Sequence, residues 1–564
     1  MYITKISGFL VTLCISTVSC QSPFFNQEKV SPFEKSGKME QIGRTGVAAM
    51  HAVLLKYESP LFCHKRTLNS SFFFFFIDSE KSILIIDKAE ENEAKLDSGI
   101  SAYSTLYDIE TNTYRTLLLE TNTFCSAGGF LGNGTFISTG GAESRGAWKA
   151  GRGHQSIRHF PPTCSDDNCL WQEFPTGKMY SNRWYPTVEQ LPDGDLIIIG
   201  GSNAGTKYNT VIKNTPSYEF WPPRTDEPIQ LDLLLHTLPY NLYPFVFLLP
   251  DGHLFIFASK KSIIYDYNEH KVVRELPPMP GVPRSYPLTG GAVMLPLRPE
   301  NDYNVEILIC GGSASPAATS AADDTCGKIN LGDKNPQWEM DTFVHKRVMP
   351  DGVFGTDGSI VWVNGCQRGY AGYKDANHDP TFDPLIYHPE KPKGSRWQQG
   401  LATTDIARMY HSVALTLPDG RIWIAGSNSV DPPDIHAKYP TEFRVEYFSP
   451  PYLFKGARPK ISHVPRIVGY NETFQILLHL EGKVGKVEVA MMRPGFSTHS
   501  MHMSQRYVYL NHEVSEDFQS VRIHSPPHAN LFPPGQAFLV VMQDGVPSVT
   551  TEFFIEHDKD DLLI

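Results

Sequence analysis

Residues 183–201 read Arg183-Trp-Tyr-Pro-Thr-Val-Glu-Gln-Leu-Pro-Asp-Gly-Asp-Leu-Ile-Ile-Ile-Gly-Gly201. Two apolar runs flank the Asp193-Gly194 pair, and two glycines end the second run. Asp-Gly favours a tight turn between antiparallel strands, and terminal glycines allow another backbone to approach closely. The stretch therefore predicts a β-hairpin whose second strand ends near a crowded axis.

The same hairpin pattern recurs about every sixty residues, which is typical of a β-propeller of the Kelch kind. Similar glycine-containing turns are expected at Leu131-Gly-Asn-Gly134, Leu249-Pro-Asp-Gly252, Met349-Pro-Asp-Gly352 and Leu417-Pro-Asp-Gly420. The strands that open successive units begin near Val47, Phe124, Trp184, Leu242, Gly290, Val344 and Tyr410. We therefore expect an all-β chain with a seven-bladed propeller over residues 40–452.

The pattern changes after Ser449-Pro-Pro-Tyr-Leu453, where shorter alternating strands follow at residues 474–478, 487–490 and 537–542. Their length and spacing suit an immunoglobulin-like β-sandwich, which we place at residues 453–558 and expect to pack on the propeller. Residues 559–564 end the chain as a solvated acidic tail.

The N-terminus predicts secretion. Lys5 precedes an apolar run from Ile6 to Val18, and small residues lead to a cut after Cys20, so residues 1–20 read as a signal peptide. A lipid anchor on Cys20 is an alternative, but the residues before it fit a lipobox poorly. Residues 21–39 form a lead-in to the propeller. No other apolar run is long enough to span a membrane, so we expect a soluble extracellular protein.

The charge pattern narrows the partners. The net charge is -11 and no sustained Lys/Arg run occurs, which argues against nucleic acid and anionic membranes as partners. The sequons at Asn69, Asn133 and Asn471 suit a glycoprotein. We expect a monomer, and attachment to the cell wall through sugars stays open.

The cysteine count is odd. Nine cysteines include Cys14 and Cys20 of the leader, which leaves seven in the mature chain. In an oxidising compartment one thiol must then have another fate. Disulfide bonds can close the loops Cys164–Cys169 and Cys310–Cys326, and Cys63 could pair with Cys366 by elimination, although spacing does not fix connectivity.

Four local sequences place metal-binding or redox-capable side chains together: Thr123-Phe-Cys125-Ser, Arg183-Trp-Tyr185-Pro, Arg408-Met-Tyr410-His411-Ser412 and Thr498-His499-Ser500. The first three open blades, and equivalent places in different blades can converge on the axis. Taken singly, each residue also suits a buried aromatic, a core histidine or an ordinary thiol. Only the combination is informative.

The combination resembles the copper radical oxidases of the glyoxal oxidase and galactose oxidase superfamily, over nearly the whole mature chain. The likeness to the glyoxal oxidase branch rests on four phrases, at Gly46–Leu55, Arg183–Gly194, Asn241–Gly252 and Gly495–Ser500. The Tyr410-His411-Ser412 motif, followed by Leu417-Pro-Asp-Gly420, is shared with galactose oxidases as well.

The resemblance implies a set of roles around one Cu(II) ion. Cys125 would be joined by a thioether to Tyr185, whose ring would bind copper and hold a stable radical; this accounts for the odd cysteine. Tyr410 would be the second tyrosine ligand and accept the substrate's proton, and His411 and His499, the latter from the sandwich, would complete the ligands. Imidazole and oxygen donors suit Cu(II). His502, near His499, could approach the copper, but we expect a supporting or surface role.

The reaction implied is the oxidation of small aldehydes, such as glyoxal or methylglyoxal, to carboxylic acids, with O2 reduced to H2O2. The copper and the tyrosyl radical would each take one of the two electrons. No extra carbohydrate-binding domain precedes the propeller, which favours aldehydes over galactose. Two alternatives stay open: the same mechanism acting on primary alcohols, and a catalytically silent Kelch-type module that binds an extracellular partner.

Overall fold

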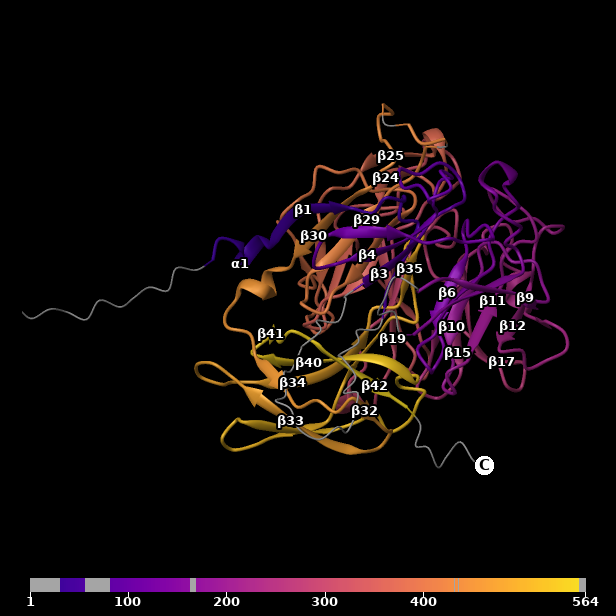
Figure 1. The fold of residues 1–564 in the computed structure, drawn as a ribbon. Coiled ribbons are helices and arrows are strands. Elements are labelled where there is room, and N and C mark those ends of the chain that lie inside the picture. Colours follow the sequence, from indigo (N-terminus) through magenta and orange to yellow (C-terminus); the bar gives the residue numbers. More distant parts are fainter. Residues whose placement is uncertain (1–30, 56–81, 163–168, 431, 435, 557–564) are drawn as a thin grey trace, which may run out of the picture.

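The computed structural model describes residues 31–55, 82–162, 169–430, 432–434 and 436–556. In these residues nearly every regular element is a strand, and the strands form a ring of seven sheets with a two-sheet C-terminal unit beside it (Figure 1). The predicted seven-bladed propeller and C-terminal sandwich are thereby confirmed. Helices of the described part are short: α1(Phe33–Ser36), η1(Gly146–Trp148), η2(Asp232–Leu234), η3(Pro299–Asn301), η4(Lys374–Ala376) and η5(Pro451–Phe454).

The first four blades each follow one stretch of chain through four antiparallel strands. Blade 1 consists of β2(His51–Leu54), β3(Ser82–Ile86), β4(Ser104–Asp108) and β5(Thr113–Thr116). Blade 2 consists of β6(Ala127–Phe130), β7(Phe136–Thr139), β8(Ser156–Phe160) and β9(Gln172–Lys178). Blade 3 consists of β10(Thr187–Gln190), β11(Leu196–Ile199), β12(Ser217–Trp221) and β13(Ile229–Gln230). Blade 4 consists of β14(Phe245–Leu248), β15(Leu254–Ala258), β16(Lys261–Asp266) and β17(Lys271–Glu275).

Blade 5 follows the same plan, and blades 6 and 7 carry additions to it. Blade 5 consists of β18(Gly291–Met294), β19(Glu306–Cys310), β20(Thr325–Asn330) and β21(Trp338–Thr342). Blade 6 consists of β22(Asp351–Phe354), β23(Ile360–Val363), β26(Leu385–Tyr387) and β27(Trp397–Gln398), with a side hairpin of β24(Cys366–Gly369) and β25(Asn377–Pro380). Blade 7 consists of β28(Ser412–Thr416), β29(Ile422–Gly426), β30(Arg444–Ser449) and the N-terminal strand β1(Lys38–Arg44).

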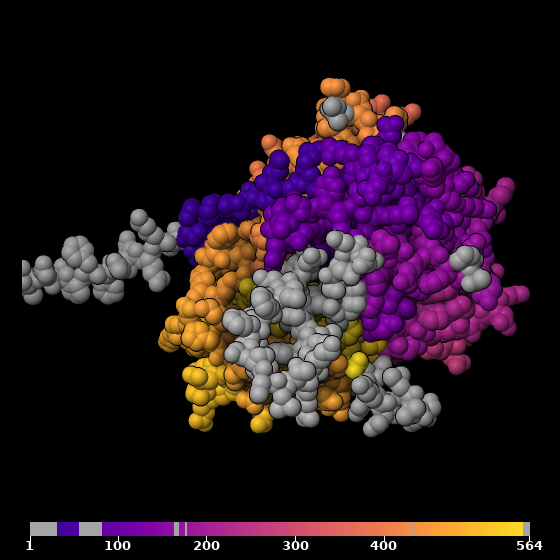
Figure 2. All heavy atoms as spheres, viewed as in Figure 1, coloured from indigo at the N-terminus to yellow at the C-terminus, as the bar shows by residue number. Residues whose placement is uncertain are grey.

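The outer strand of blade 7 comes from the start of the chain. Strand β1 pairs antiparallel with β30, from Lys38 opposite Ser449 to Arg44 opposite Arg444. Figures 1 and 2 show this indigo segment lying against the orange residues of the last blade. Sequence reasoning had treated residues 21–39 as a lead-in and did not foresee that β1 closes the ring, because a single strand carries no hairpin signal of its own.

The Asp-Gly turn expected in the opening stretch joins β10 to β11. The Leu191 amide donates to the Asp195 carbonyl over 2.8 Å, and the Gly194 amide donates to the Leu191 carbonyl over 2.9 Å. The turns at 131–134, 249–252 and 417–420 likewise join the first two strands of their blades.

The turn expected at Met349-Pro-Asp-Gly352 is wrong. Asp351 and Gly352 begin strand β22, and the chain turns later, at residues 355–359, where the Gly355 amide donates to the Ser359 carbonyl over 2.7 Å. The reason is the position of Met349, which follows Arg347 by two residues as Tyr185 follows Arg183, so that it precedes an inner strand instead of ending one.

The glycine pairs act as the sequence indicated. Gly140 and Gly311 have φ values of 75° and 69°, in the left-handed region. A Cβ atom added at Gly140 would lie 2.4 Å from the Arg183 carbonyl of the next blade, and one at Gly311 would lie 2.3 Å from the Arg347 carbonyl. Only glycine allows neighbouring blades to approach so closely.

The C-terminal unit is a sandwich of two sheets. One sheet contains β31(Lys460–Ser462), β33(Thr473–His479), β39(Ser520–His524) and β38(His512–Val514). The other contains β32(Ile467–Val468), β42(Thr551–Ile555), β40(Gly535–Gln543), β34(Val487–Arg493) and β37(Arg506–Tyr509), with β41(Val546–Pro547) paired to β40. Its predicted strands at 474–478, 487–490 and 537–542 lie in β33, β34 and β40.

A hairpin of this C-terminal unit enters the propeller. It consists of β35(Phe496–Thr498) and β36(Met501–Met503), and β35 pairs with the inner strand β2 of blade 1. The hairpin also contacts the inner strands β6, β10, β18, β22 and β28 of other blades. The hairpin therefore occupies the axis of the propeller.

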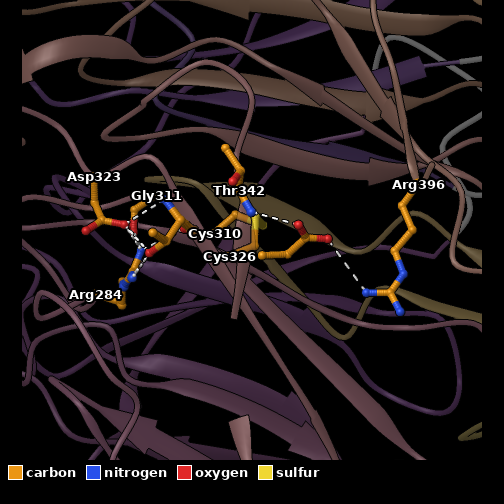
Figure 3. The surroundings of a disulfide bond; sticks show 9 residues. Arg284, Cys310, Gly311, Asp323, Cys326, Thr342 and Arg396 are labelled. Carbon is orange, nitrogen blue, oxygen red and sulfur yellow. Dashed lines mark hydrogen bonds and ion pairs between the residues drawn. A yellow bond between two sulfur atoms is a disulfide. The ribbon is translucent and has the colours of Figure 1, made fainter. Parts of the chain in front are cut away.

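One expected disulfide bond, Cys310–Cys326, is present and joins the adjacent strands β19 and β20. Figure 3 shows it between the Arg284–Asp323 ion pair on one side and Arg396 on the other. Cys169 is also disulfide-bonded, but its expected partner Cys164 lies outside the described residues. Cys366 is a free buried thiol, so the pairing with Cys63 suggested by elimination is wrong. Its Sγ lies 3.3 Å from the Arg368 carbonyl.

Several sequence predictions fall outside the described residues: the signal peptide at 1–20, Cys63, the sequon at Asn69 and the tail at 559–564. The two sequon asparagines that are described, Asn133 and Asn471, are exposed. Within the described ranges no helix is long and apolar enough to cross a membrane.

Candidate functional site

The loops that precede the inner strands of neighbouring blades are joined by backbone hydrogen bonds around the axis. Cys125 and Tyr185 each lie two residues before an inner strand, β6 and β10. The Tyr185 amide donates to the Cys125 carbonyl over 3.0 Å, and the Tyr243 amide donates to the Tyr185 carbonyl over 3.0 Å. Left-handed φ values occur at Cys125, Tyr185 and His411, of 54°, 63° and 64°. Such strained conformations in side-chain-bearing residues are held only by surrounding contacts and often mark functional sites.

The five site residues predicted from the sequence lie close together at the propeller axis: Cys125, Tyr185, Tyr410, His411 and His499. Among the described residues, Cys125, His411 and His499 form the one group of histidine, cysteine and acidic side chains whose possible ligand atoms lie within 4.8 Å of one another. Cys125 Sγ lies 3.3 Å from His499 Nε2. The Tyr410 ring stacks on the His411 ring with centroids 3.6 Å apart, and the Tyr185 and His499 ring centroids are 6.3 Å apart. Each of the five is buried.

The Cys125 thiol lies among aromatic side chains. Burial raises its pKa well above the usual value of a thiol. The neighbouring polar side chains of Trp184, Tyr185 and Tyr410 oppose this rise. The sulfur therefore lies near the ring to which the sequence resemblance joins it, and it is a protonated thiol unless a cation or an oxidation changes it.

The histidine tautomers follow from their hydrogen bonds. His411 Nδ1 lies 3.1 Å from the Asn428 carbonyl, which can only accept, so Nδ1 carries the proton. His411 Nε2 then presents a lone pair, and it is buried with no hydrogen-bond partner in the described part of the chain. Burial lowers the pKa of both His411 and His499 well below the usual value, so both rings are neutral.

Sequence reasoning missed Tyr286. Its hydroxyl lies 2.8 Å from the Tyr410 hydroxyl, and its ring stacks on Tyr185 with centroids 4.6 Å apart. A usable signal was present, because Arg284-Ser-Tyr286-Pro repeats the pattern of Arg183-Trp-Tyr185-Pro. The Trp184 ring lies parallel to the Tyr185 ring, at an interplanar angle of 3°.

The arginine of this pattern holds each loop in place. Arg183 Nη1 donates to the Gly200 carbonyl over 2.8 Å, and Arg408 Nη1 donates to the Gly426 carbonyl over 2.8 Å. Their Nε atoms bind the buried carboxylates Glu219 and Glu446, over 2.7 Å and 2.8 Å. The arginine therefore locks the tyrosine two residues later to the glycine end of its own blade.

His502 takes no part in the cluster. It lies on β36, and its Nε2 is 3.2 Å from Asp351 Oδ1 on the inner strand of blade 6. Asp351 Oδ2 accepts in turn from Asn364 Nδ2 over 2.9 Å. His502 therefore fastens the axial hairpin to blade 6, which agrees with the supporting role expected for it.

Comparisons with known proteins show the family of this chain. Residues 63–452 match the family model described as Glyoxal oxidase N-terminus, and residues 458–553 match the Galactose oxidase-like, Early set domain. Aldehyde oxidase GLOX from Vitis pseudoreticulata is 36% identical over 90% of this chain and 95% of that protein. Aldehyde oxidase GLOX1 from Arabidopsis thaliana is 36% identical over 79% of this chain and 74% of that protein.

A solved structure, described as a novel fungal alcohol oxidase with catalytic diversity among the AA5 family, in complex with copper, superposes with a TM-score of 0.65. It covers 92% of this chain and 100% of its own, but at 19% identity it supports the fold alone. Together the matches place the chain in the class of galactose oxidase-like oxidases. Within that class it belongs to the glyoxal oxidase family. The resemblance read from the sequence and the assignment as an oxidase are both confirmed.

The family implies copper, and the donors present fit it. Two neutral imidazoles offer their Nε2 atoms, and two phenols, Tyr185 and Tyr410, lie beside them. Burial raises the pKa of both phenols well above the usual value, because solvent no longer compensates the charge of a phenolate. A divalent cation would supply that compensation and would also occupy the unpartnered His411 Nε2. Nitrogen and oxygen donors in this mixture suit Cu(II).

Proposed function

We propose that this chain is a copper oxidase that converts small aldehydes, of the glyoxal and methylglyoxal type, to carboxylic acids while reducing O2 to H2O2. The observation that carries the proposal is the buried group of Cys125, His411 and His499, whose possible ligand atoms lie within 4.8 Å of one another, with the rings of Tyr185 and Tyr410 beside it. A thiol, two phenols and two imidazoles without a carboxylate suit redox chemistry better than hydrolysis. The relatives named as aldehyde oxidases support the choice of substrate.

We assign the ligands to Tyr185, Tyr410, His411 and His499, and we propose a thioether between Cys125 and Tyr185. Bound copper would supply a one-electron couple and an open position at which the substrate oxygen is polarised. The Tyr185 ring, made easier to oxidise by its sulfur substituent, would store the second oxidising equivalent. The stacked rings of Trp184 and Tyr286 would keep solvent and reductants away from it.

Proton transfer falls to Tyr410. An aldehyde hydrate loses two electrons and two protons to become an acid, and O2 takes up the same number to become H2O2. The Tyr410 oxygen would accept the first proton from the hydrate hydroxyl as a general base. The Tyr286 hydroxyl, 2.8 Å away, is within reach to hold or pass on that proton.

The wider predictions are part of the same proposal. We place the domain boundaries at residues 20, 39, 452 and 558, as read from the sequence. We propose that the mature protein is a secreted, glycosylated monomer that meets its substrate and O2 outside the cell, free or held at the cell wall through sugars. Mass determination of the protein recovered from the culture medium tests cleavage after Cys20 and sugar on Asn133 and Asn471.

The experiment that tests the activity measures H2O2 release by copper-treated protein with glyoxal, methylglyoxal and a panel of primary alcohols. We expect release with the aldehydes, and loss of at least a hundredfold in the Cys125→Ser variant. Faster H2O2 release with primary alcohols would show that alcohols, and not aldehydes, are the substrates of the same mechanism. Absence of H2O2 from a protein that binds copper would favour the silent binding module.

A further inference from the structure

The phrase Gly46–Leu55 contributed to the family resemblance, yet none of its residues has a role so far. His51 is the first residue of β2 and is fully buried. In the antiparallel pairing of β2 with β35, His51 lies directly opposite Thr498, the residue before the proposed ligand His499. The backbone pairing thus brings a buried histidine of blade 1 next to a ligand supplied by the C-terminal unit.

His51 makes two hydrogen bonds that lead to opposite sides of the centre. His51 Nε2 lies 3.2 Å from the Thr123 carbonyl, two residues before Cys125. His51 Nδ1 lies 2.8 Å from Thr498 Oγ1, and Thr498 Oγ1 lies 2.6 Å from His499 Nδ1. One side chain therefore connects the Cys125 loop with the ring whose Nε2 is 3.3 Å from Cys125 Sγ.

The Thr123 carbonyl, at one end of this series of hydrogen bonds, determines which atom donates in each of them. The Thr123 carbonyl can only accept, so His51 Nε2 donates and His51 Nδ1 is left as an acceptor. Thr498 Oγ1 then donates to His51 Nδ1 and accepts from His499 Nδ1. His499 is held as the Nδ1–H tautomer, and its Nε2 carries an unprotonated lone pair beside Cys125 Sγ. Burial lowers the pKa of His51 to about 3, so the ring is neutral as this direction requires.

We propose that His51, acting through Thr498, is the positioning residue that fixes the tautomer and orientation of His499 and ties it to the Cys125 loop. The proposal rests on the copper centre proposed above. It differs from the arrangement at His411, where a backbone carbonyl receives the Nδ1 proton directly. Because no carboxylate takes part, the relay orients the ligand without adding negative charge to the centre.

The test compares removal of the relay with its retention. Thr498→Val keeps the shape of the side chain and removes its hydrogen bonds, while Thr498→Ser keeps the hydroxyl. His51→Phe removes the acceptor, while His51→Asn keeps an amide oxygen near the position of Nδ1. Thermal unfolding of the copper-free variants shows which of them fold; if His51→Phe does not, the Thr498 pair carries the test.

Two readouts are used on the full-length protein. In copper-free protein labelled with 15N-histidine, we expect the His499 signals of the Nδ1–H tautomer in wild type and Thr498→Ser, and a tautomer mixture in Thr498→Val. In Cu(II) titrations against a competing chelator, we expect about 10- to 100-fold weaker binding for Thr498→Val and His51→Phe. The Cu(II) affinities of Thr498→Ser and His51→Asn should stay within about threefold of wild type. The double variant with both Thr498→Val and His51→Phe should bind Cu(II) only slightly more weakly than either single variant.

The inference is overturned if folded Thr498→Val keeps the wild-type tautomer, or binds Cu(II) as tightly as wild type with the same electron paramagnetic resonance spectrum. Failure of the wild-type protein to bind Cu(II) would instead overturn the proposed function. The tautomer measurement on copper-free protein still decides the role of His51 in that case.

Discussion

At the scale of single residues, hydrogen bonds select one tautomer of each histidine proposed to bind copper. His411 and His499 both carry their proton on Nδ1 because each is bound there by an oxygen, a carbonyl in one case and the Thr498 hydroxyl in the other. Their Nε2 atoms are then unprotonated, and each offers a lone pair that a metal ion could accept. Sequence motifs identify such residues, but the tautomer depends on partners from distant parts of the chain.

Tyr286 offers a test of the proton-transfer role proposed for Tyr410. Tyr286→Phe removes only the hydroxyl that lies 2.8 Å from the Tyr410 hydroxyl. We expect kcat for aldehyde oxidation to fall roughly 10- to 100-fold, because a proton-transfer partner is lost, and the pH profile of kcat to change. Steady-state H2O2 assays across pH measure both.

The matched control is Tyr103→Phe, since the Tyr103 hydroxyl is also buried but binds the Leu119 carbonyl in blade 1. That variant should lose about 1 kcal/mol of stability and keep its pH profile. Equal kinetic effects of the two substitutions would show that Tyr286 acts through stability alone.

The sequence was sufficient for the residues that share a motif with the family, namely Cys125, Tyr185, Tyr410, His411 and His499. It was insufficient for Tyr286 and His51, for different reasons. Tyr286 follows a recognisable Arg-x-Tyr-Pro pattern, but in a blade whose first two strands are joined by residues 295–305 without an Asp-Gly turn. His51 gains its meaning only from Thr498, 447 positions away.

At the scale of elements, the loops that carry the tyrosines are fixed by buried arginines. Arg183 binds Glu219 through Nε and the carbonyls of Gly200 and Ser217 through Nη1. A lysine cannot reproduce this fork. We expect Arg183→Lys to cost about 1–3 kcal/mol, because the buried Gly200 and Ser217 carbonyls lose their hydrogen bonds. Thermal unfolding measures the loss, and H2O2 assays should show a parallel fall as Tyr185 loses its support.

Arg224→Lys serves as the control in the same blade. Arg224 pairs with Asp193 and Asp195 at the surface, where such pairs contribute about 0–1 kcal/mol. If the two substitutions lowered the unfolding temperature equally, the special role assigned to the buried fork would be refuted.

Hairpins with Asp-Gly turns were predictable because turn chemistry is local. The wrong turn at 349–352 shows the limit of that signal, since the same Pro-Asp-Gly letters there open a strand. Asp351 is held in β22 by His502 and Asn364, neither of which is close in sequence. The position of the motif two residues after Arg347 makes it the start of an inner strand, and the longer-range contacts of Asp351 hold it there.

At the scale of the whole molecule, both ends of the chain complete the propeller. Strand β1 supplies the outer strand of blade 7, and the β35–β36 hairpin fills the axis and supplies His499. The ring was predictable from the repeat, and the C-terminal unit from its change of pattern. Neither contribution of the ends was predictable in detail, because single pairings between distant strands leave no periodic trace.

Removing the N-terminal strand tests the closure of the ring. A mature chain that begins at residue 45 lacks β1 and exposes the edge of β30, whereas one that begins at residue 31 keeps it. We expect the shorter chain to unfold at a temperature several degrees lower, because the pairing with β30 is lost. Its copper affinity should stay close to that of the longer chain, since the proposed ligands lie in other elements. Identical unfolding temperatures for the two chains would contradict closure by β1.

The most direct test of the central claim is the mass of the tryptic peptides of copper-treated, deglycosylated protein after full reduction. The proposed thioether predicts that the peptide Thr116–Arg145 is joined to Trp184–Lys207, with the loss of two hydrogens and with no separation by reductant. If both peptides remain separate after complete copper loading, Cys125 and Tyr185 do not form the cofactor, and the radical mechanism proposed for this chain is wrong.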